Sequence, residues 1–262
     1  MEDDLADKWK SFSLSEVEQA DVGIQDSLQG SIDDHKDYCL IFSLLTRKFF
    51  NKEAFKSVMR TVWSPVKGVK FFDLGENVFL AQFADQGDKK KVCLNSPWSF
   101  NKNLVLLMDY VGDVQSSRIK MHFASFWVRL YDLPLMGMNS ETARSIGESI
   151  GNVEDIDLYS QSPGWGVFLR VRIRLDVCCP LPSVKRLCLR NGEVLWVHLK
   201  YERLPNFCYY CGKLGHSDRD CELWVLKRAL FEKDGFPYGV WLRAEGRNST
   251  NGQRKSFSRV LP

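Results

Sequence analysis

The sequence predicts an α+β fold, because short apolar segments rich in β-branched and aromatic residues alternate with segments that have a helical hydrophobic period. Twice along the chain these segments follow the order strand, helix, strand, strand, fourth element, strand. The composition allows packed cores, with 44% hydrophobic and 13% aromatic residues in a chain of 262. We therefore expect two similar folded units, followed by a small C-terminal region with different chemistry.

The first expected unit covers residues 37–112. Its strands are expected at 38–46, 69–74, 78–84 and 103–110, and its helices at 51–63 and 87–95. Asn51 is a suitable N-cap for the first helix, in which Phe55 and Met59 recur at helical spacing. The β-α-β-β-α-β order is that of the ferredoxin-like arrangement, also used by RNA-recognition motifs (RRMs), in which two helices cover one face of an antiparallel sheet.

A polar linker at 113–120 leads to a second expected unit at 121–204. Its strands are expected at 126–134, 153–160, 166–177 and 193–205, with a helix at 139–151. The fourth element, at 181–191, lies beside Pro180 and Pro182, and proline disfavours a helix interior. We expect this unit to be a variant of the first, with the fourth element a helix, a loop or a sheet edge.

A metal site is predicted between residues 205 and 222. Cys208, Cys211, His216 and Cys221 have the spacing C-x2-C-x4-H-x4-C, which lets a short loop place three thiolates and one imidazole around one ion. Zinc takes four such ligands tetrahedrally, and a closed set without an open position is structural and not catalytic. The spacing therefore predicts a zinc knuckle of the CCHC type that holds one structural Zn²⁺.

The two ends of the chain are predicted to differ from its body. Residues 1–36 are expected to form an acidic, partly disordered leader, and residues 1–37 hold 11 acidic and 3 basic side chains. Residues 38–262 hold 33 basic and 22 acidic side chains, which favours an anionic partner. The leader either masks that charge or only aids solubility. Residues 223–244 are expected to form a short helix and a strand-like extension, and residues 245–262 a disordered basic tail.

The sequence indicates an intracellular protein, nuclear or cytoplasmic and not secreted. Its start lacks the features of a secretory signal, and no apolar run approaches the ~20 residues that span a bilayer. Cysteines in such a compartment stay reduced. The five that are not predicted zinc ligands are expected to be ordinary buried thiols, namely Cys39, Cys93, Cys178, Cys179 and Cys188.

Alternating side chains on three strands of the second unit predict one cationic and aromatic sheet face. Its predicted contacts to nucleic acid are Trp127, Arg129, Tyr131, Arg170, Arg172, Arg174, Trp196 and Lys200. Arginine matches phosphate through its planar donors, and aromatic rings stack on unpaired bases, so this face suits a single strand. Two alternatives stay open, because the arginines could instead pair with neighbouring acids or contact the first unit.

The knuckle offers a second set of contacts. The predicted ones are Tyr209, Tyr210, Lys213, Leu214 and Arg219. Knuckles receive exposed bases beside aromatic and apolar side chains, while cations contact phosphate. The alternative is a knuckle that binds protein or only joins parts of the chain.

The first unit is less suited to base stacking. Val78, Leu80 and Gln82 stand where an RRM places its stacking aromatics, with Phe79 and Phe83 facing the core. Its outer apolar positions are instead expected to pack on the second unit.

Several segments carry a resemblance to a known family. They are LADKWKSFSLSEVE, FKSVMRTVWSPVKGVKFFDLGENVFLAQF, the pair Pro97 and Trp98, FWVRLYDLP, LRVRIRLDV, YERLPNFCYYCGKLGHSDRDC and YGVWLRA. In these the chain resembles plant proteins that join a domain of unknown function to a CCHC zinc knuckle and are related to the gag-like first open reading frame of plant LINE-type retrotransposons. The resemblance implies an RRM-like first domain, a structural zinc and nucleic-acid binding in RNA chaperoning or packaging.

The leading interpretation is a non-enzymatic, zinc-dependent binder of single-stranded RNA or DNA. The alternative is a module for protein interaction or self-association that uses the knuckle and the sheet faces. Catalysis is disfavoured because the metal site is closed, and because the sequence has neither a phosphate-binding glycine loop nor a nucleophile elbow. We expect no membrane partner and no small-molecule substrate.

Overall fold

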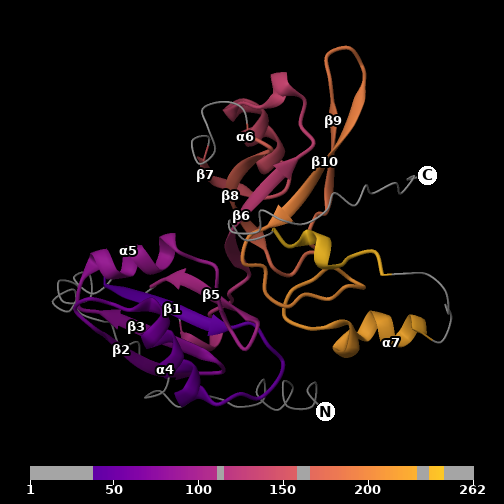
Figure 1. Cartoon of the computed structure of the whole chain (residues 1–262). Helices are drawn as coiled ribbons and strands as arrows, with labels where there is room; N and C mark the ends of the chain where they lie inside the picture. Colours follow the sequence, from indigo (N-terminus) through magenta and orange to yellow (C-terminus); the bar gives the residue numbers. More distant parts are fainter. Residues whose placement is uncertain (1–37, 111–114, 158–165, 229–235, 245–262) are drawn as a thin grey trace, which may run out of the picture.

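The computed structural model describes residues 38–110, 115–157, 166–228 and 236–244. Within these residues it confirms an α+β protein with two five-stranded antiparallel sheets (Figure 1). The two units and the segment with the predicted metal ligands meet at the centre of the molecule. The predicted acidic leader and basic tail lie outside the described residues.

The first sheet has the strand order β2-β3-β1-β5-β4. Its unit contains, in chain order, β1 (Cys39–Leu44), α4 (Lys52–Trp63), β2 (Val69–Gly75), β3 (Val78–Phe83), α5 (Gln86–Leu94), β4 (Trp98–Phe100) and β5 (Asn103–Asp109). The first helix begins as predicted, since the Asn51 side chain accepts a hydrogen bond from the Ala54 backbone N–H at 3.0 Å. Apart from β4, the unit has the predicted order of elements.

Both helices of the first unit pack on the same sheet face. Phe55 and Trp63 of α4 and Val92 of α5 share one buried cluster with side chains of β1 and β3. The Phe42 ring lies 5.6 Å from that of Phe55 and 5.3 Å from that of Phe79, measured between centroids. Ring contacts of this kind add stability beyond the burial of apolar area. The helix-covered face is therefore closed, which leaves the other face and the sheet edges for function.

Strand β4 is an edge strand that the sequence did not predict. Residues Trp98–Phe100 pair with β5 in a hairpin whose two turn residues, Asn101 and Lys102, have φ values of 48° and 63°. Two-residue hairpin turns with positive φ match the twist of the flanking strands, and asparagine suits the first position. The hairpin places Trp98 and Lys102 at the edge of the first sheet.

The second sheet has the strand order β7-β8-β6-β10-β9. Its unit contains β6 (Phe123–Tyr131), α6 (Ser140–Glu148), β7 (Asn152–Asp157), β8 (Phe168–Asp176), β9 (Val184–Cys188) and β10 (Val194–Tyr201). Of the three alternatives expected for the fourth element, the structure shows the sheet edge, strand β9, so the expected β-α-β-β-α-β order with a second helix is wrong for this unit. Pro180 and Pro182 disfavour a helix, and Val184–Cys188 pairs with β10 along its whole length.

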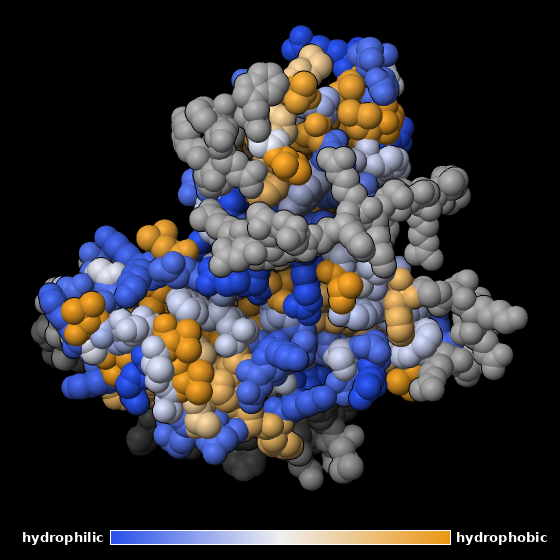
Figure 2. Space-filling model, viewed as in Figure 1, coloured by the Kyte–Doolittle hydropathy of each residue, from blue (hydrophilic) through white to orange (hydrophobic). Residues whose placement is uncertain are grey.

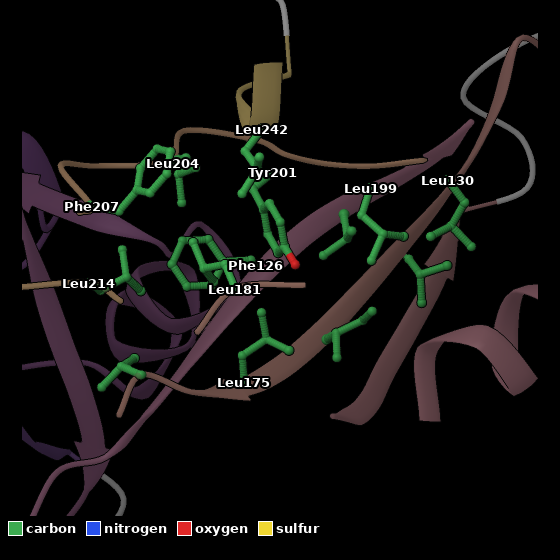
Figure 3. Close-up of a cluster of buried hydrophobic side chains, with 14 of the residues drawn as sticks. Phe126, Leu130, Leu175, Leu181, Leu199, Tyr201, Leu204, Phe207, Leu214 and Leu242 are labelled. Carbon is green, nitrogen blue, oxygen red and sulfur yellow. The ribbon is translucent and has the colours of Figure 1, made fainter. Parts of the chain in front are cut away.

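Residues from beyond the second sheet fill the place of the missing helix. Leu204, Phe207, Leu214 and Leu242 join the same buried cluster as the strand residues that α6 covers (Figure 3). Tyr201 lies at its centre, with no exposed surface, and its hydroxyl donates a hydrogen bond to the Pro182 carbonyl at 2.7 Å. The core of the second unit is therefore completed by the segment that carries the metal ligands.

The outer face of the first sheet packs on this second core along β5. Leu104 and Leu106 belong to the second cluster, whereas Val105 between them belongs to the first. Leu45 also packs there, and its backbone N–H donates to the Leu104 carbonyl at 2.8 Å. The prediction that outer apolar positions of the first unit pack on the second is confirmed for β5.

Short elements complete the described chain. They are the 3-10 turns η2 (Ser116–Arg118), η3 (Leu135–Gly137), η4 (Asp218–Asp220) and η5 (Val240–Leu242), and the helix α7 (Glu222–Arg228). A parallel bridge joins Tyr201 to Arg243, so the chain after η5 returns to the end of β10. In the described part of the chain, no helix combines the length and apolarity that a membrane span would need.

Candidate metal centre and nucleic-acid interface

The four predicted zinc ligands converge in one place. The donor atoms of Cys208, Cys211, His216 and Cys221 all lie within 4.8 Å of one another, and Cys211 Sγ is 3.3 Å from His216 Nε2. Zinc bonds of about 2.3 Å to sulfur and 2.0 Å to nitrogen, in tetrahedral geometry, need donor separations of this size. The cluster therefore fits a four-coordinate zinc ion.

A tight backbone turn shapes the cluster. The Gly212 N–H donates to the Cys208 carbonyl at 2.9 Å, and the Cys208 N–H donates to the Lys213 carbonyl at 2.8 Å. Gly212 and Gly215 have φ values of 73° and 85°, which glycine adopts without steric cost. The turn thus brings Cys208 and Cys211 toward His216, as the spacing predicted.

Burial makes the cluster depend on a cation. Removal from water raises the pKa of the Cys208 thiol to about 12, although the Cys211 backbone N–H donates to its sulfur at 3.4 Å. Without a metal, this thiol is protonated at neutral pH. Zinc binds the thiolate, so its charge would compensate the cost of ionising a buried sulfur.

The knuckle is held by both units. From the second unit, the Leu181 N–H donates to the Gly212 carbonyl at 2.9 Å. From the first, Lys48 pairs with Asp220 at 2.8 Å and Arg47 pairs with Glu222. In Figure 2 hydrophilic surface gathers where the knuckle segment adjoins the first unit. The metal centre is thus in contact with both units and connects them.

The knuckle residues predicted to contact bases are only partly available. Leu214 is 5% exposed and belongs to the second core, so its predicted contact with a base is wrong. Tyr209 is half-buried with its ring 5.0 Å from Phe207, and Tyr210 lies 5.1 Å from the Trp224 ring. Apolar packing therefore removes Leu214 from the surface and leaves Tyr209 and Tyr210 partly exposed.

The two predicted knuckle cations remain accessible. Lys213 is half-buried and Arg219 is exposed. Among the described residues neither forms an ion pair, so both keep their charge available for phosphate.

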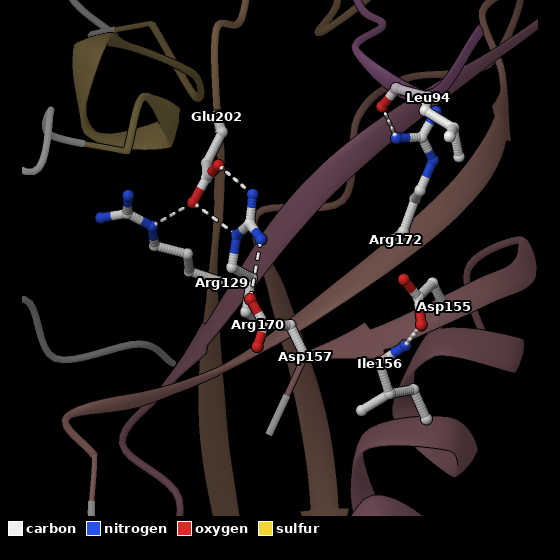
Figure 4. Close-up of polar contacts among 8 residues, drawn as sticks. All are labelled: Leu94, Arg129, Asp155, Ile156, Asp157, Arg170, Arg172 and Glu202. Atoms are coloured by element: carbon white, nitrogen blue, oxygen red, sulfur yellow. Dashed lines mark hydrogen bonds and ion pairs between the residues drawn. The ribbon is translucent and has the colours of Figure 1, made fainter. Parts of the chain in front are cut away.

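Two of the predicted arginines on the second sheet are neutralised by acids (Figure 4). Glu202 accepts hydrogen bonds from Arg129 Nε at 2.7 Å and from Arg170 Nε and Nη2 at 3.0 and 2.9 Å. Arg170 also pairs with Asp157 at 2.9 Å and lies over the Trp127 ring, 3.8 Å from its centroid. Arg129 is 8% exposed. The open alternative of arginines paired with neighbouring acids is therefore what the structure shows here.

Arg172 contacts the first unit instead of solvent. Its guanidinium donates to the Leu94 carbonyl, to the Cys93 carbonyl at 2.8 Å and to Ser96 Oγ at 2.9 Å. These groups lie at the C-terminal end of α5, where the carbonyl ends of the helix dipole favour a cation. Glu154 completes the shell at 3.0 Å. With 7% exposure, Arg172 is an interface residue, and its predicted contact with nucleic acid is wrong.

The other predicted residues of this face are more accessible. Arg174 is exposed beside the Phe123 ring, 5.1 Å from its centroid, and Trp196 is 44% exposed. Lys200 and Tyr131 are half-buried and lie together, with the ammonium 4.9 Å from the ring centroid. These four side chains could still contact a ligand, but they do not form the continuous arginine surface that was predicted.

The sequence reasoning missed the acids that neutralise this face. Glu202 follows Lys200 by two residues, so strand alternation places both side chains on the same face. That signal was present and was not used. The cations Arg203 and Arg243 were also missed, because they lie in loop segments without hydrophobic periodicity.

Three of the five other cysteines are not buried, contrary to prediction. Cys178, Cys179 and Cys188 are exposed, whereas Cys39 is buried and Cys93 is half-buried. Burial raises the pKa of the Cys93 thiol to about 11. The exposed three lie after β8 and in the edge strand β9, away from either core.

Two segments of the chain match known domain families. Residues 175–223 match the zinc knuckle family, and residues 32–118 match a domain of unknown function, DUF4283. The chain therefore contains one segment similar to each of these two domain families. The knuckle match begins within β8, in agreement with the packing of the metal segment into the second core.

A curated relative matches only part of the chain. An uncharacterized protein of Arabidopsis thaliana is 25% identical over 134 residues, which cover 51% of this chain and 42% of that protein. The chain therefore spans less than half the length of this relative.

Two solved structures of yeast RNA-binding proteins show a partial likeness to this chain. The three N-terminal RNA-binding domains of a splicing factor align over 58% of this chain and 67% of that chain, with 9% identity and a TM-score of 0.24. The first two RRM domains of a poly(U)-binding protein align over 52% and 81%, with 16% identity and a TM-score of 0.22.

Proposed function

We propose that this protein is a non-enzymatic binder of single-stranded RNA or DNA whose binding surface depends on one structural zinc ion. The observation that carries the proposal is the knuckle itself, a CCHC cluster fixed between two sheets with unpaired cations beside it. Knuckles of this ligand type are common modules for exposed bases. The net positive body of the chain supports an anionic partner.

The resemblance to gag-like proteins extends this proposal. An RRM-like first unit and a knuckle in one chain suit a protein that coats or remodels RNA within a ribonucleoprotein. The strand order β2-β3-β1-β5 with both helices on one face supports the RRM-like interpretation. A closed set of four ligands leaves no position for a substrate on the metal, which supports a role without catalysis.

A second candidate function rests on exposed apolar side chains. Leu223, Val225 and Leu226 of α7 are 54%, 62% and 71% exposed, next to the knuckle. Such a surface favours contact with another protein or a second copy of this chain. Salt separates the two functions, because phosphate contacts weaken steeply with salt and apolar contacts do not.

The test measures fluorescence anisotropy of labelled single-stranded RNA and DNA with the zinc-loaded protein across a salt series. We expect affinity to fall log-linearly with salt, with a slope of about 0.7 per phosphate contact. Cys211→Ser should abolish binding, whereas Cys188→Ser, at an exposed cysteine away from the metal, should leave it unchanged. Absence of binding at low salt by a folded, zinc-containing sample would refute the proposal.

A further inference from the structure

A basic groove lies where four segments of the chain meet. It has a volume of about 690 Å³ and is lined by Trp98, Lys102, Arg203, Asn206, Tyr209 and Arg243, among others. These residues come from the β4–β5 hairpin, the loop between β10 and the metal ligands, the knuckle and the chain after η5. We propose that this groove, called here the hairpin groove, holds one segment of a single-stranded nucleic acid.

This inference rests on the proposed function and names the place where the strand lies. Each unit contributes a wall, so neither unit alone would form the groove. The Asn206 N–H donates to the Lys102 carbonyl at 2.7 Å, which fixes the loop before the knuckle against the hairpin. The groove is therefore built into the contact between the units and is not a gap between independent bodies.

The charge of the hairpin groove is positive throughout. Among the residues that the structure describes, Lys102, Arg203 and Arg243 line it and no acidic side chain does so. Arg203 donates to the Ser96 carbonyl at 3.3 Å, and Arg243 donates to the Leu204 carbonyl and to the Pro205 carbonyl at 3.0 Å. These acceptors are neutral, so the guanidinium charges are not cancelled by their partners.

The groove cations have no carboxylate partner in their immediate surroundings among the described residues, and none of the three forms an ion pair there. Burial lowers the pKa of the Arg203 guanidinium, the charge of Glu202 opposes this change, and the charges of Arg172 and Arg170 lower the pKa further. A phosphate group would relieve this repulsion among cations.

Aromatic side chains lie beside the cations. The Trp98 Nε1–H donates to the Val92 carbonyl at 2.8 Å, which fixes the indole ring, and the Arg203 guanidinium lies 5.9 Å from its centroid. Tyr209 lies on the knuckle side of the groove. Both rings are half-buried, so each keeps exposed surface. A fixed ring beside cations suits an unpaired base with its phosphate.

The chemistry of the lining selects the occupant. Three cations without an acid favour a polyanion over a peptide, and two aromatic rings favour exposed bases over a polyanion that has none. The cleft between β5 and the second sheet differs, because Asp109, Glu154 and Asp155 line it together with Arg172 and Arg174. Its acids would repel phosphate.

The decisive variants change Lys102, which is exposed and has positive φ in the hairpin turn. Lys102→Gly removes the charge at a backbone position that glycine fits, so the fold should remain intact. We expect about a three- to tenfold loss of affinity for a labelled single-stranded RNA, with a salt slope reduced by about 0.7.

Two control variants accompany this change. Lys102→Arg keeps the charge and should bind to within about twofold of the wild type. Lys90→Gln removes an exposed charge on α5 outside the groove and should also stay within about twofold.

Cross-linking supplies a measurement that does not depend on a variant. The wild-type protein is irradiated with RNA containing 4-thiouridine, and cross-linked residues are identified by mass spectrometry. We expect adducts at Trp98 or Tyr209, suppressed by unlabelled RNA and not by polyphosphate at equal phosphate concentration. If the wild type binds RNA but Lys102→Gly matches Lys90→Gln and adducts form elsewhere, the groove is refuted and the proposed function stands. If the wild type binds no strand at all, the proposed function itself fails.

Discussion

The outer face of the second sheet and the hairpin groove both combine cations with aromatic rings, but their charges have different partners. On the sheet, Arg129 and Arg170 share Glu202, and Arg172 contacts Glu154. In the groove, Arg203 and Arg243 donate only to neutral carbonyls among the contacts described above. The first set stabilises the protein, whereas the second retains charge for a ligand.

The comparison teaches that arginines predicted by strand alternation to share one sheet face need not form a positively charged surface in the folded protein. A guanidinium that donates to a carboxylate satisfies its donors and cancels its charge, so it gains little from a phosphate. A guanidinium held by carbonyls is positioned but remains positive. Which of the two occurs depends on acids that reach the face from loops and neighbouring strands.

Metal removal should have the largest effect and should separate the two regions. Tyr209 lies between two zinc ligands and lines the groove. By contrast, Arg129, Arg170 and Glu202 on the second sheet lie outside the knuckle segment. Structural zinc contributes about 10–16 kcal/mol in small knuckle-type domains. We expect chelation to release the knuckle and lower the thermal midpoint strongly, measured by differential scanning calorimetry with and without chelator.

Two readouts control the chelation experiment. Cys188→Ser should unfold as the wild type does and respond to chelator in the same way, because Cys188 is exposed in β9. Strand binding should disappear with the metal. A chelated protein that keeps its full affinity for RNA would show that neither knuckle nor groove carries the binding.

Glu202→Gln should have the next largest effect, because it leaves two arginines without their shared carboxylate. Removing one partner of a buried pair costs about 3–5 kcal/mol, and the 17% exposure of the Glu202 side chain places the expected loss near the lower end. Urea unfolding monitored by circular dichroism measures it. The matched control is Glu148→Gln, whose exposed pair with Arg144 should contribute less than about 1 kcal/mol. Equal stability of both variants would contradict the structural role of the cluster.

The same carboxylate predicts a pH dependence. Burial of Glu202 opposes its ionisation, but hydrogen bonds from Arg170 and Arg129, with their charges, outweigh burial and hold the pKa below its ordinary value. Its contribution is therefore present above the unfolded pKa of about 4.3 and is lost as the pH falls through the lower folded pKa. We expect the difference in unfolding free energy between wild type and Glu202→Gln to shrink from pH 6 toward pH 3. A constant difference over this range would contradict the assignment.

The sequence predicted the elements whose signals are local. The Asn51 cap, the helical spacing of Phe55 and Met59, and the spacing of the metal ligands each depend on residues a few positions apart, and the structure confirms them. The edge strand β9 could not be chosen over a helix, because proline excludes one conformation without specifying another. Its identity depends on pairing with β10 and on the residues that fill the place of a helix.

The candidate site was harder to predict, because its residues meet only in three dimensions. Leu214 looked like a base contact by its place in the knuckle, yet it packs with Phe207 in the second core. Arg172 looked solvent-facing by alternation, yet it contacts the end of α5, which precedes it by 78 residues. Lys102, Arg203 and Arg243 come from three segments, so no local pattern groups them.

Arg172→Lys should have the smallest effect and tests the sheet side of the comparison. Lysine keeps the charge, but its ammonium has three donors on one atom and cannot serve the four acceptors of Arg172, which lie on Glu154, Leu94, Cys93 and Ser96. We expect a loss of about 1–3 kcal/mol in unfolding free energy, since buried acceptors lose donors, with RNA affinity within twofold of wild type. Arg186→Lys on the exposed edge strand should change neither quantity. If Arg172→Lys instead weakened RNA binding more than Lys102→Gly while leaving stability intact, the sheet face and not the hairpin groove would be the binding surface.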